Sequence, residues 1–317
     1  MKRCAAVAAA ALCVPLLLAS LDADAGRVYR WKDRYGVNQY VDQPPAASDA
    51  PAGAVEARHY ASPASVQVSM RLEADAGGYK VWADNRLHAP VEVSLRLKRG
   101  AVVATPALPA RSVVPARGSL LLVHLVRREG SDRGDFELLL DALPGDPAAR
   151  HADYAYRIPF DRAKVQVDQG PGGSFSHADA ENLHALDFAL PEGTPILAAR
   201  AGVVVQVQSG FEQSGVQDDY GGLANHIRIL HQDGSMALYA HLQPDGVQVH
   251  PGQRVAKGQL IGQSGNTGLS TAPHLHFVVQ VNRGMHLVSV PVRIAAPLGE
   301  LRFPEPPAAA GSTRQPL

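Results

Sequence analysis

The stretch that decides the fold is Pro273-His274-Leu275-His276-Phe277-Val278-Val279-Gln280-Val281. Side chains alternate between the two faces of a β-strand, so the apolar residues from Leu275 onward at every second position share one face. His274 and His276 therefore project together from the opposite face. Two imidazoles on one face, backed by a packed apolar face, form a rigid platform for a metal ion or a proton relay. Taken alone, the pair fits a functional site and two surface histidines on an exposed strand equally well.

Two other segments repeat this arrangement. In residues 185–190 the apolar side chains define a core face, and Asp187 projects from the other face between two alanines. In residues 238–242, alternation places Tyr239 and His241 on one face and the leucines and Ala240 on the other. Three strands that each direct polar side chains away from an apolar face favour a metal site over scattered surface histidines.

A turn signal connects two of the expected strands. Asp233-Gly234 lies between two alternating runs and indicates a β-hairpin with a two-residue loop. Counting outward from such a loop pairs His226 with His241 across the strands, which would bring another imidazole near the site. His231, beside the turn, is expected to stabilise the turn by a hydrogen bond rather than to bind a metal.

Several motifs together carry a resemblance to a known family. They include Tyr-Ala-His-Leu at 239–242, Ser-Gly-Asn-Thr-Gly at 264–268 and Pro-His-Leu-His-Phe at 273–277. Three more segments fit the same series, at 192–204, 249–255 and 257–262. In this order, over about 120 residues, the chain resembles the lysostaphin/LytM-type zinc endopeptidases that cut peptidoglycan peptides.

This resemblance implies a two-sheet, groove-like β fold with one Zn²⁺ on its floor. Asp187 and His276 match ligands of that family, whereas His241 and His274 match two catalytic histidines that are not ligands. Spacing alone would not separate His274 from His276. Two imidazoles and a carboxylate leave one tetrahedral position for a water, whose pKa zinc lowers toward about 7. One neighbouring imidazole is expected to relay the proton to the leaving amine, and the other to donate to the oxyanion.

The third ligand departs from the commonest family pattern, which has a histidine four residues before the aspartate. That position is Leu183 here, and His184 lies an odd number of residues from Asp187, which directs it to the opposite face. His177 resembles the Ser-His of a subgroup in which a short loop separates the ligand from the Ala-Leu-Asp-Phe strand. We therefore expect His177, preceded by three nearby glycines, to be the third ligand.

The rest of the chain has a modular pattern that is typical of a mostly β protein. A basic start, an apolar stretch and Ala23-Asp24-Ala25 predict a secretory signal peptide, with an uncleaved membrane anchor as the alternative. A small hairpin, a Pro/Ala/Ser-rich linker and a β-sandwich-like region follow. The predicted modules are a signal peptide (1–25), a β-hairpin module (26–45), a linker (46–65), a β-sandwich-like domain (66–157), a zinc metallopeptidase domain (158–292) and a Pro/Ala-rich tail with little order (293–317).

Composition excludes some classes of function. The 30 Lys and Arg residues balance 30 Asp and Glu residues, which argues against nucleic-acid binding through a broad basic surface. Cys4 and Cys13 are the only cysteines and lie in the signal segment, so a mature chain has no thiol nucleophile. After signal cleavage we expect no stable membrane span and a location in the periplasm or cell envelope.

The leading hypothesis is a secreted zinc endopeptidase that cuts peptidoglycan peptides, with stem or bridge peptides as its partners. An inactive relative that binds the wall or activates another hydrolase is the second hypothesis; it is disfavoured because every matched position is occupied. A sugar-binding β protein is disfavoured by an aromatic content of 6%. A glycine bridge and a direct stem-peptide cross-link are both open as the bond that is cut.

Overall fold

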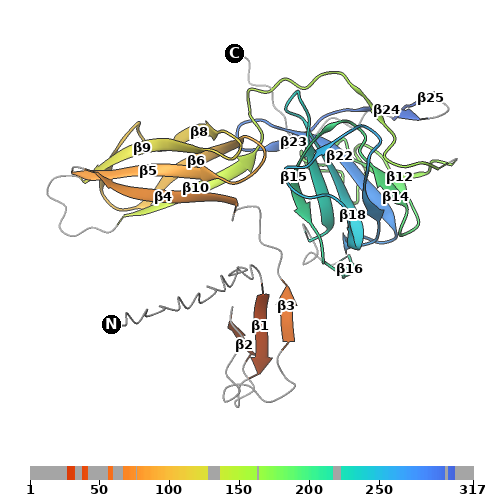
Figure 1. The fold of residues 1–317 in the computed structure, drawn as a ribbon, viewed down its shortest axis with the longest axis horizontal. Coiled ribbons are helices and arrows are strands. Elements are labelled where there is room, and N and C mark those ends of the chain that lie inside the picture. The colour runs from red at the N-terminus through yellow and green to blue at the C-terminus, as the bar shows by residue number, and fades with distance from the viewer. Residues whose placement is uncertain are drawn as a thin grey trace, which may run out of the picture. The chain divides into compact units, whose positions relative to one another are not determined.

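The computed structural model describes residues 27–32, 38–41, 56–59, 67–75, 77–127, 136–162, 164–216, 223–296 and 299–303. The predicted signal peptide lies outside these ranges. Within them the chain forms β-strands and no α-helix, as the alternating sequence predicts (Figure 1). No helix of the length and apolar character that a membrane span needs occurs in the described ranges. The chain divides into two compact units, residues 1–60 and 61–317.

The first unit contains a three-stranded antiparallel sheet. β1 (Arg27–Lys32) pairs with β2 (Asn38–Val41), as expected for the hairpin module, and with β3 (Glu56–His59). The prediction of a linker over 46–65 is wrong for β3. An isolated two-stranded hairpin is marginally stable, and β3 supplies the backbone partners that the second edge of β1 would otherwise lack.

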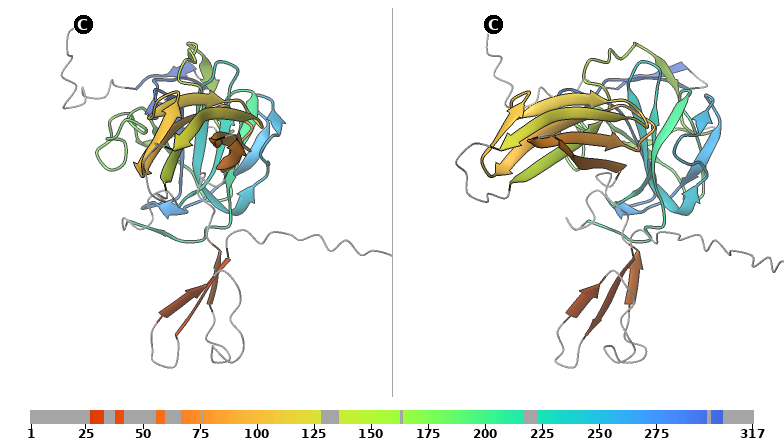
Figure 2. Two further views of the ribbon diagram at one scale, coloured as in Figure 1. Left: turned by 90° about the vertical axis from the view of Figure 1, so that its left-hand side faces the viewer. Right: turned by 60° about the vertical axis from the view of Figure 1, so that its left-hand side comes forward.

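The second unit begins with the expected sandwich (Figure 2). One sheet has the order β4-β5-β9-β7 and the other the order β10-β6-β8. The apolar faces of both sheets meet in a core that includes Val81, Leu95 and Leu125. The strands are β4 (Val68–Asp75), β5 (Gly78–Asn85), β6 (Val91–Arg99), β7 (Val102–Thr105), β8 (Ala110–Val114), β9 (Ser119–Arg127) and β10 (Glu137–Pro144).

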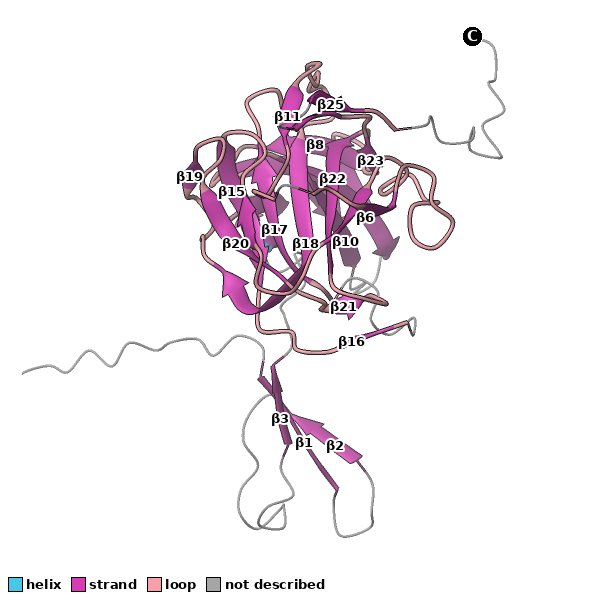
Figure 3. Ribbon diagram, turned by 90° about the vertical axis from the view of Figure 1, so that its right-hand side faces the viewer, coloured by secondary structure: helices cyan, strands magenta, loops and turns pink. Residues whose placement is uncertain are grey.

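The third region is built on a large, mainly antiparallel sheet with the order β12-β13-β22-β18-β17-β15-β19; β22, β18, β17 and β15 lie side by side in Figure 3. β20 pairs with both β18 and β14, and the apolar core forms on the face that carries Phe277 and Leu186. The other strands are short: β16 pairs with β21, and β23 pairs with β22. The bounds are β12 (Val167–Gln169), β13 (Leu186–Ala189), β14 (Pro195–Leu197), β15 (Gly202–Gln208), β16 (Ser214–Gly215), β17 (Asn225–Leu230), β18 (Met236–Val247), β19 (Arg254–Val255), β20 (Leu260–Ser264), β21 (Gly268–Leu269), β22 (His274–Asn282) and β23 (Leu287–Ser289).

Both predicted boundaries of this region cut through its core. β11 (Ala155–Arg157) pairs in parallel with β24 (Arg293–Ala296), which also pairs with β25 (Gly299–Leu301). Tyr156 is 3% exposed and Ile294 is 0% exposed, and both side chains belong to the core of the third region. The tail therefore starts later than residue 293, because the segment after 292 contributes a strand before the prolines begin. Residues 304–317 lie outside the described ranges.

The hairpin of β17 and β18 has a longer loop than the sequence suggested. The backbone N–H of His231 donates to Ser235 (2.8 Å), and that of Gly234 donates to His231 (3.0 Å). The loop thus has three residues and ends at Gly234, whose φ of +80° is readily adopted only by glycine. Because the loop is one residue longer, His226 lies opposite Ala240 rather than opposite His241.

Candidate metal centre

Asp187 and His276 lie directly opposite each other on the neighbouring strands β13 and β22. The side chains that alternate with them, such as Leu186 and Phe277, are fully buried in the core. The predicted faces of these two strands are therefore confirmed. The register brings Nδ1 of His276 to 2.9 Å from Oδ1 of Asp187, so the two side chains share one spot on the opposite face.

A glycine-rich loop brings His177 to the same carboxylate. Its Nε2 lies 3.3 Å from Oδ2 of Asp187, and its side chain is 0% exposed. The ring donates from Nδ1 to the carbonyl of Gly170 at 2.9 Å, which leaves the Nε2 lone pair facing the carboxylate. The loop that carries it turns at Gly172, with a φ of +71°. His177 thus lies at the Asp187 carboxylate, and His184 is not among the clustered residues.

His177, Asp187 and His276 are buried, and one ligand atom of each lies within 4.8 Å of the others. Burial disfavours the charged carboxylate, but the imidazoles of His177 and His276 outweigh this and hold the pKa of Asp187 well below its usual range. Burial also opposes protonation of His177, but Asp187 raises its pKa overall. Nε2 of His177 is buried and has no hydrogen-bond partner among the described residues. A divalent cation with nitrogen and oxygen ligands at about 2.0–2.2 Å fits this donor set and would satisfy that atom.

The sequence analysis missed Gln169, which holds the carboxylate of Asp187 in place. Its amide donates to Oδ2 of Asp187 (3.1 Å) and to Oγ of Ser176 (2.7 Å), and its carbonyl oxygen accepts from the backbone of Phe175 (3.1 Å). A Cβ on Gly173 would lie 2.2 Å from the Gln169 side chain, so only glycine allows this approach. Gln169 therefore joins the loop before His177 to Asp187.

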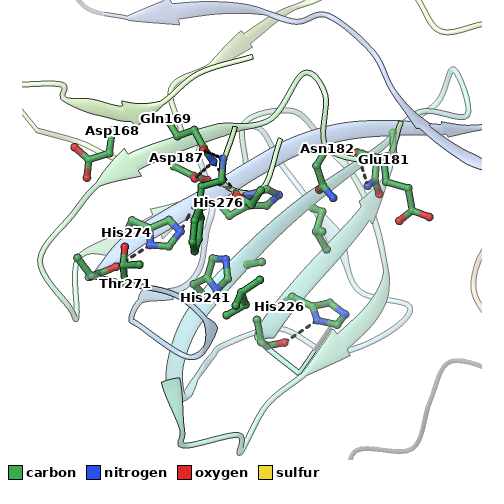
Figure 4. Close-up of a pocket in the computed structure, with 18 of the residues that line it drawn as sticks. Asp168, Gln169, Glu181, Asn182, Asp187, His226, His241, Thr271, His274 and His276 are labelled. Atoms are coloured by element: carbon green, nitrogen blue, oxygen red, sulfur yellow. Dashed lines mark hydrogen bonds and ion pairs between the residues drawn. The ribbon is translucent and has the colours of Figure 1, made fainter. Parts of the chain in front are cut away.

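His241 and His274 lie beside this set (Figure 4). Their ring centroids are 4.5 Å apart, and Nε2 of His274 is 3.9 Å from Oδ1 of Asp187. Backbone carbonyls accept from the Nδ1 atoms, Thr267 for His241 (2.7 Å) and Ala272 for His274 (2.8 Å). In these tautomers both Nε2 atoms carry a lone pair.

His241 reaches the site by a different route from the one that alternation predicts. Tyr239 is 0% exposed in the core, where its hydroxyl accepts from the backbone of Ala199, so the prediction that Tyr239 and His241 share a face is wrong. His241 is the extra residue of a β-bulge, with a φ of +62°. The bulge turns its side chain to the face of Ala240. Burial, with the charges of His274 and His276, lowers the pKa of His241 to about 3, so it is neutral at pH 7.

Two other histidines from the sequence analysis lie elsewhere. His231 is not part of the His-Asp-His cluster: its Nδ1 donates to the carbonyl of Ala201 (2.9 Å), just before β15, and only its backbone bonds within the turn. His226 lines the same groove as the metal-binding set but donates to its neighbour Ala224 (2.9 Å). Burial lowers the pKa of both imidazoles to about 4, so both are neutral at pH 7.

The site lies in a groove of about 560 Å³ on the open face of the large sheet. A buried His-Asp-His set beside two imidazoles with free lone pairs is typical of a metal-dependent hydrolase. Comparison with known proteins agrees with this class. Residues 181–287 match the model of peptidase family M23, and residues 16–69 match a domain of unknown function, DUF4124.

Curated relatives support the same assignment. The chain is 42% identical over 91 residues to peptidoglycan DD-endopeptidase ShyA of Vibrio cholerae, covering 29% of this chain and 18% of that protein. It is 41% identical over 102 residues to glycyl-glycine endopeptidase ALE-1 of Staphylococcus capitis, covering 32% and 25%. It is 36% identical over 124 residues to DD-carboxypeptidase/endopeptidase Mpg of Neisseria meningitidis, covering 38% and 24%. The chain thus spans a quarter or less of the length of these relatives. Residues 181–287 are a peptidase M23 domain homologous to theirs.

Solved structures include two similar chains. Lysostaphin of Staphylococcus simulans is 34% identical, with 37% of this chain and 43% of that chain covered and a TM-score of 0.29. The catalytic domain of the M23 protein EnpA from Enterococcus faecalis is 26% identical, with 42% and 92% covered and a TM-score of 0.32.

Proposed function

We propose that this protein is a secreted zinc endopeptidase that hydrolyses peptide cross-links of peptidoglycan. The observation that carries the proposal is the convergence of His177, Asp187 and His276 beside the imidazoles of His241 and His274. The M23 match and the names of the relatives, which are peptidoglycan and glycyl-glycine endopeptidases, support the substrate class. The signal-like N-terminal segment supports a location in the periplasm or envelope.

In this proposal His177, through Nε2, Asp187 and His276, through Nδ1, hold one zinc ion. Zinc, when bound, polarises a carbonyl and lowers the pKa of a water. Gly170 keeps the His177 ring in the ligating tautomer, and Gln169 holds the carboxylate in position. These supporting contacts determine which atoms face the ion.

We assign proton transfer to His274 and orientation of the attacking water to His241. The Nε2 lone pair of His274 takes the proton from the attacking water and returns it to the leaving amine. Neutral His241 accepts a hydrogen bond at Nε2 and orients that water. Because both Nδ1–H groups are bound to backbone carbonyls, a donor for the oxyanion arises only on a ring that has taken up a proton at Nε2.

The test is digestion of purified sacculi by the full chain, with zinc content measured on the same sample. We expect about one zinc per chain, loss of cross-linked muropeptides by mass spectrometry, inhibition by a chelator and recovery with zinc. The masses of the products identify which bond is cut. Binding to sacculi without any change in the muropeptides would contradict catalysis and favour a wall-binding or activating role.

A further inference from the structure

The groove continues beyond the metal-binding set toward a buried arginine. Arg228 projects from β17 onto the groove face, and its neighbours Ile227 and Ile229 point into the core. It is 8% exposed, and among the described residues it is the one lysine or arginine that lines the groove. The guanidinium is thus a fixed positive charge on the groove wall, on the same strand as His226, whose pKa it helps to lower.

The described partners of Arg228 do not neutralise its charge. Nη1 donates to the neutral Oε1 of Gln280 at 2.5 Å, and Nε is buried without a partner among the described residues. The charge of Glu181 acts to raise the pKa of this guanidinium, but among the described residues no ion pair within 4.0 Å joins the two. Burial lowers the pKa of Arg228 to about 10, so the side chain is still a cation at neutral pH.

A buried cation without an anionic partner is costly unless a ligand supplies the counter-charge. Arg228 is held at the groove wall, since Gln280 in turn donates from Nε2 to the backbone carbonyl of Glu181 (2.9 Å). A planar guanidinium matches the two oxygens of a carboxylate better than any neutral peptide group. The groove therefore provides an anion subsite whose recognition element is already positioned.

The distance from Arg228 to the reacting centre can be estimated along β22, which carries both His276 and Gln280, the partner of Arg228. Gln280 is four residues from His276 on β22, which corresponds to roughly 13 Å at about 3.3 Å per residue. An extended peptide in the groove covers that distance with about three to four residues. We propose that Arg228 binds a free carboxylate of the substrate peptide, about three to four residues from the bond that is cut. This inference rests on the proposed peptidase function and adds a specificity determinant to it.

The experiment compares cross-linked muropeptide dimers with the same dimers after their carboxyl groups are converted to carboxamides. For the unmodified full chain, we expect amidation to lower kcat/KM by about ten- to a hundred-fold, mainly through KM, because a charge-assisted pair is replaced by a neutral contact. R228Q should bring the ratio of the two kcat/KM values close to one, and R228K should restore part of it. E181Q, which removes a negative charge that would repel the substrate carboxylate, should keep the ratio or increase it. R254Q, at an exposed position on β19, is the matched control and should leave the ratio unchanged.

Three outcomes would overturn the inference or its basis. Equal cleavage of both dimers by the unmodified chain would show that no carboxylate is recognised, whether or not R228Q folds. Equal loss of both activities in R228Q, with a lower melting temperature, would show that Arg228 only supports the sheet. Cleavage of neither dimer would overturn the proposed function, and the ratio of the dissociation constants, measured by calorimetry on the same chain, would then decide the inference.

Discussion

The stability of the peptidase domain should depend on pH through His231, a buried imidazole remote from the metal-binding set. The ring is 2% exposed, contacts the ring of Tyr156 edge-on at 5.6 Å and has a buried Nε2 without a hydrogen-bond partner among the described residues. Burial, with the positive charge of Arg200, outweighs the opposing effects of Ala201 and Asp233 and lowers the pKa of His231 to about 4. A protonated imidazole is therefore disfavoured in the folded state.

The sign of the effect follows from comparing this pKa with an unfolded value of about 6.5. Above pH 6.5 the imidazole is neutral in both states, and its contribution to stability is fully present. As the pH falls from about 6.5 to about 4, the unfolded state takes up a proton first, so stability is lost across this window. A difference of about 2.5 pKa units corresponds to about 3 kcal/mol in the free energy of unfolding.

The assay is amide hydrogen exchange of β17 and β18, measured with chelator present at pH 7.5 and at pH 4.5, in the full chain and in H231Q. Glutamine can still donate to Ala201 but does not titrate, so the two proteins share every other pH effect, including those of the metal-binding histidines. We expect the free energy of opening to fall by about 2–3 kcal/mol more in the unmodified chain than in H231Q. Parallel changes in the two proteins would refute the reasoning, because His231 would then titrate normally in the folded state.

The remaining predictions concern the ligands and the domain boundaries. H177A should weaken zinc binding by more than about a hundred-fold, whereas H184A should leave it nearly unchanged; a competition titration giving the reverse order would contradict the ligand assignment. H274A should keep its zinc, by elemental analysis, but hydrolyse cross-linked muropeptides about 10²–10⁴ times more slowly; loss of the metal would make His274 a ligand. A fragment of residues 153–303 should unfold at a higher urea concentration than a fragment of residues 158–292. The shorter fragment lacks β11 and β24, whose buried apolar side chains contribute about 3–6 kcal/mol. Equal midpoints would mean that these strands contribute no stability.

Regular alternation was sufficient to predict much of this fold. The faces of β13 and β22 follow from the period-two pattern, which places Asp187 and His276 opposite the core. The sandwich follows in the same way from several short alternating runs. His177 was identified from a resemblance in its motif, because no periodic pattern connects a loop residue to a strand that begins nine residues later.

Alternation of apolar and polar residues does not predict the length of a loop or the pairing of distant segments. Asp233-Gly234 fits a two-residue loop as well as a three-residue loop that ends in glycine, and the two differ by one residue in register. The parallel pairing of β11 with β24 joins segments more than 130 residues apart. A short apolar strand next to a proline-rich tail has no local signal that assigns it to the core of another region.

The groove residues whose positions regular alternation does not give lie where the strands are irregular, and these irregularities build the site. In a regular strand His241 would share the buried face of Tyr239, and Gln169 would share the core side of Val167. A bulge in β18 moves His241 to the groove, and a register shift in β12 places Gln169 opposite Asp187. A non-glycine residue at a φ of +62° costs on the order of 1–3 kcal/mol, which the pairing of β18 with β17 and β22 must offset. A bulge re-aims a single side chain and disrupts the ladder only locally. The regular strands therefore place Asp187 and His276, whereas irregular backbone places His177, His241 and Gln169, which holds Asp187 in position.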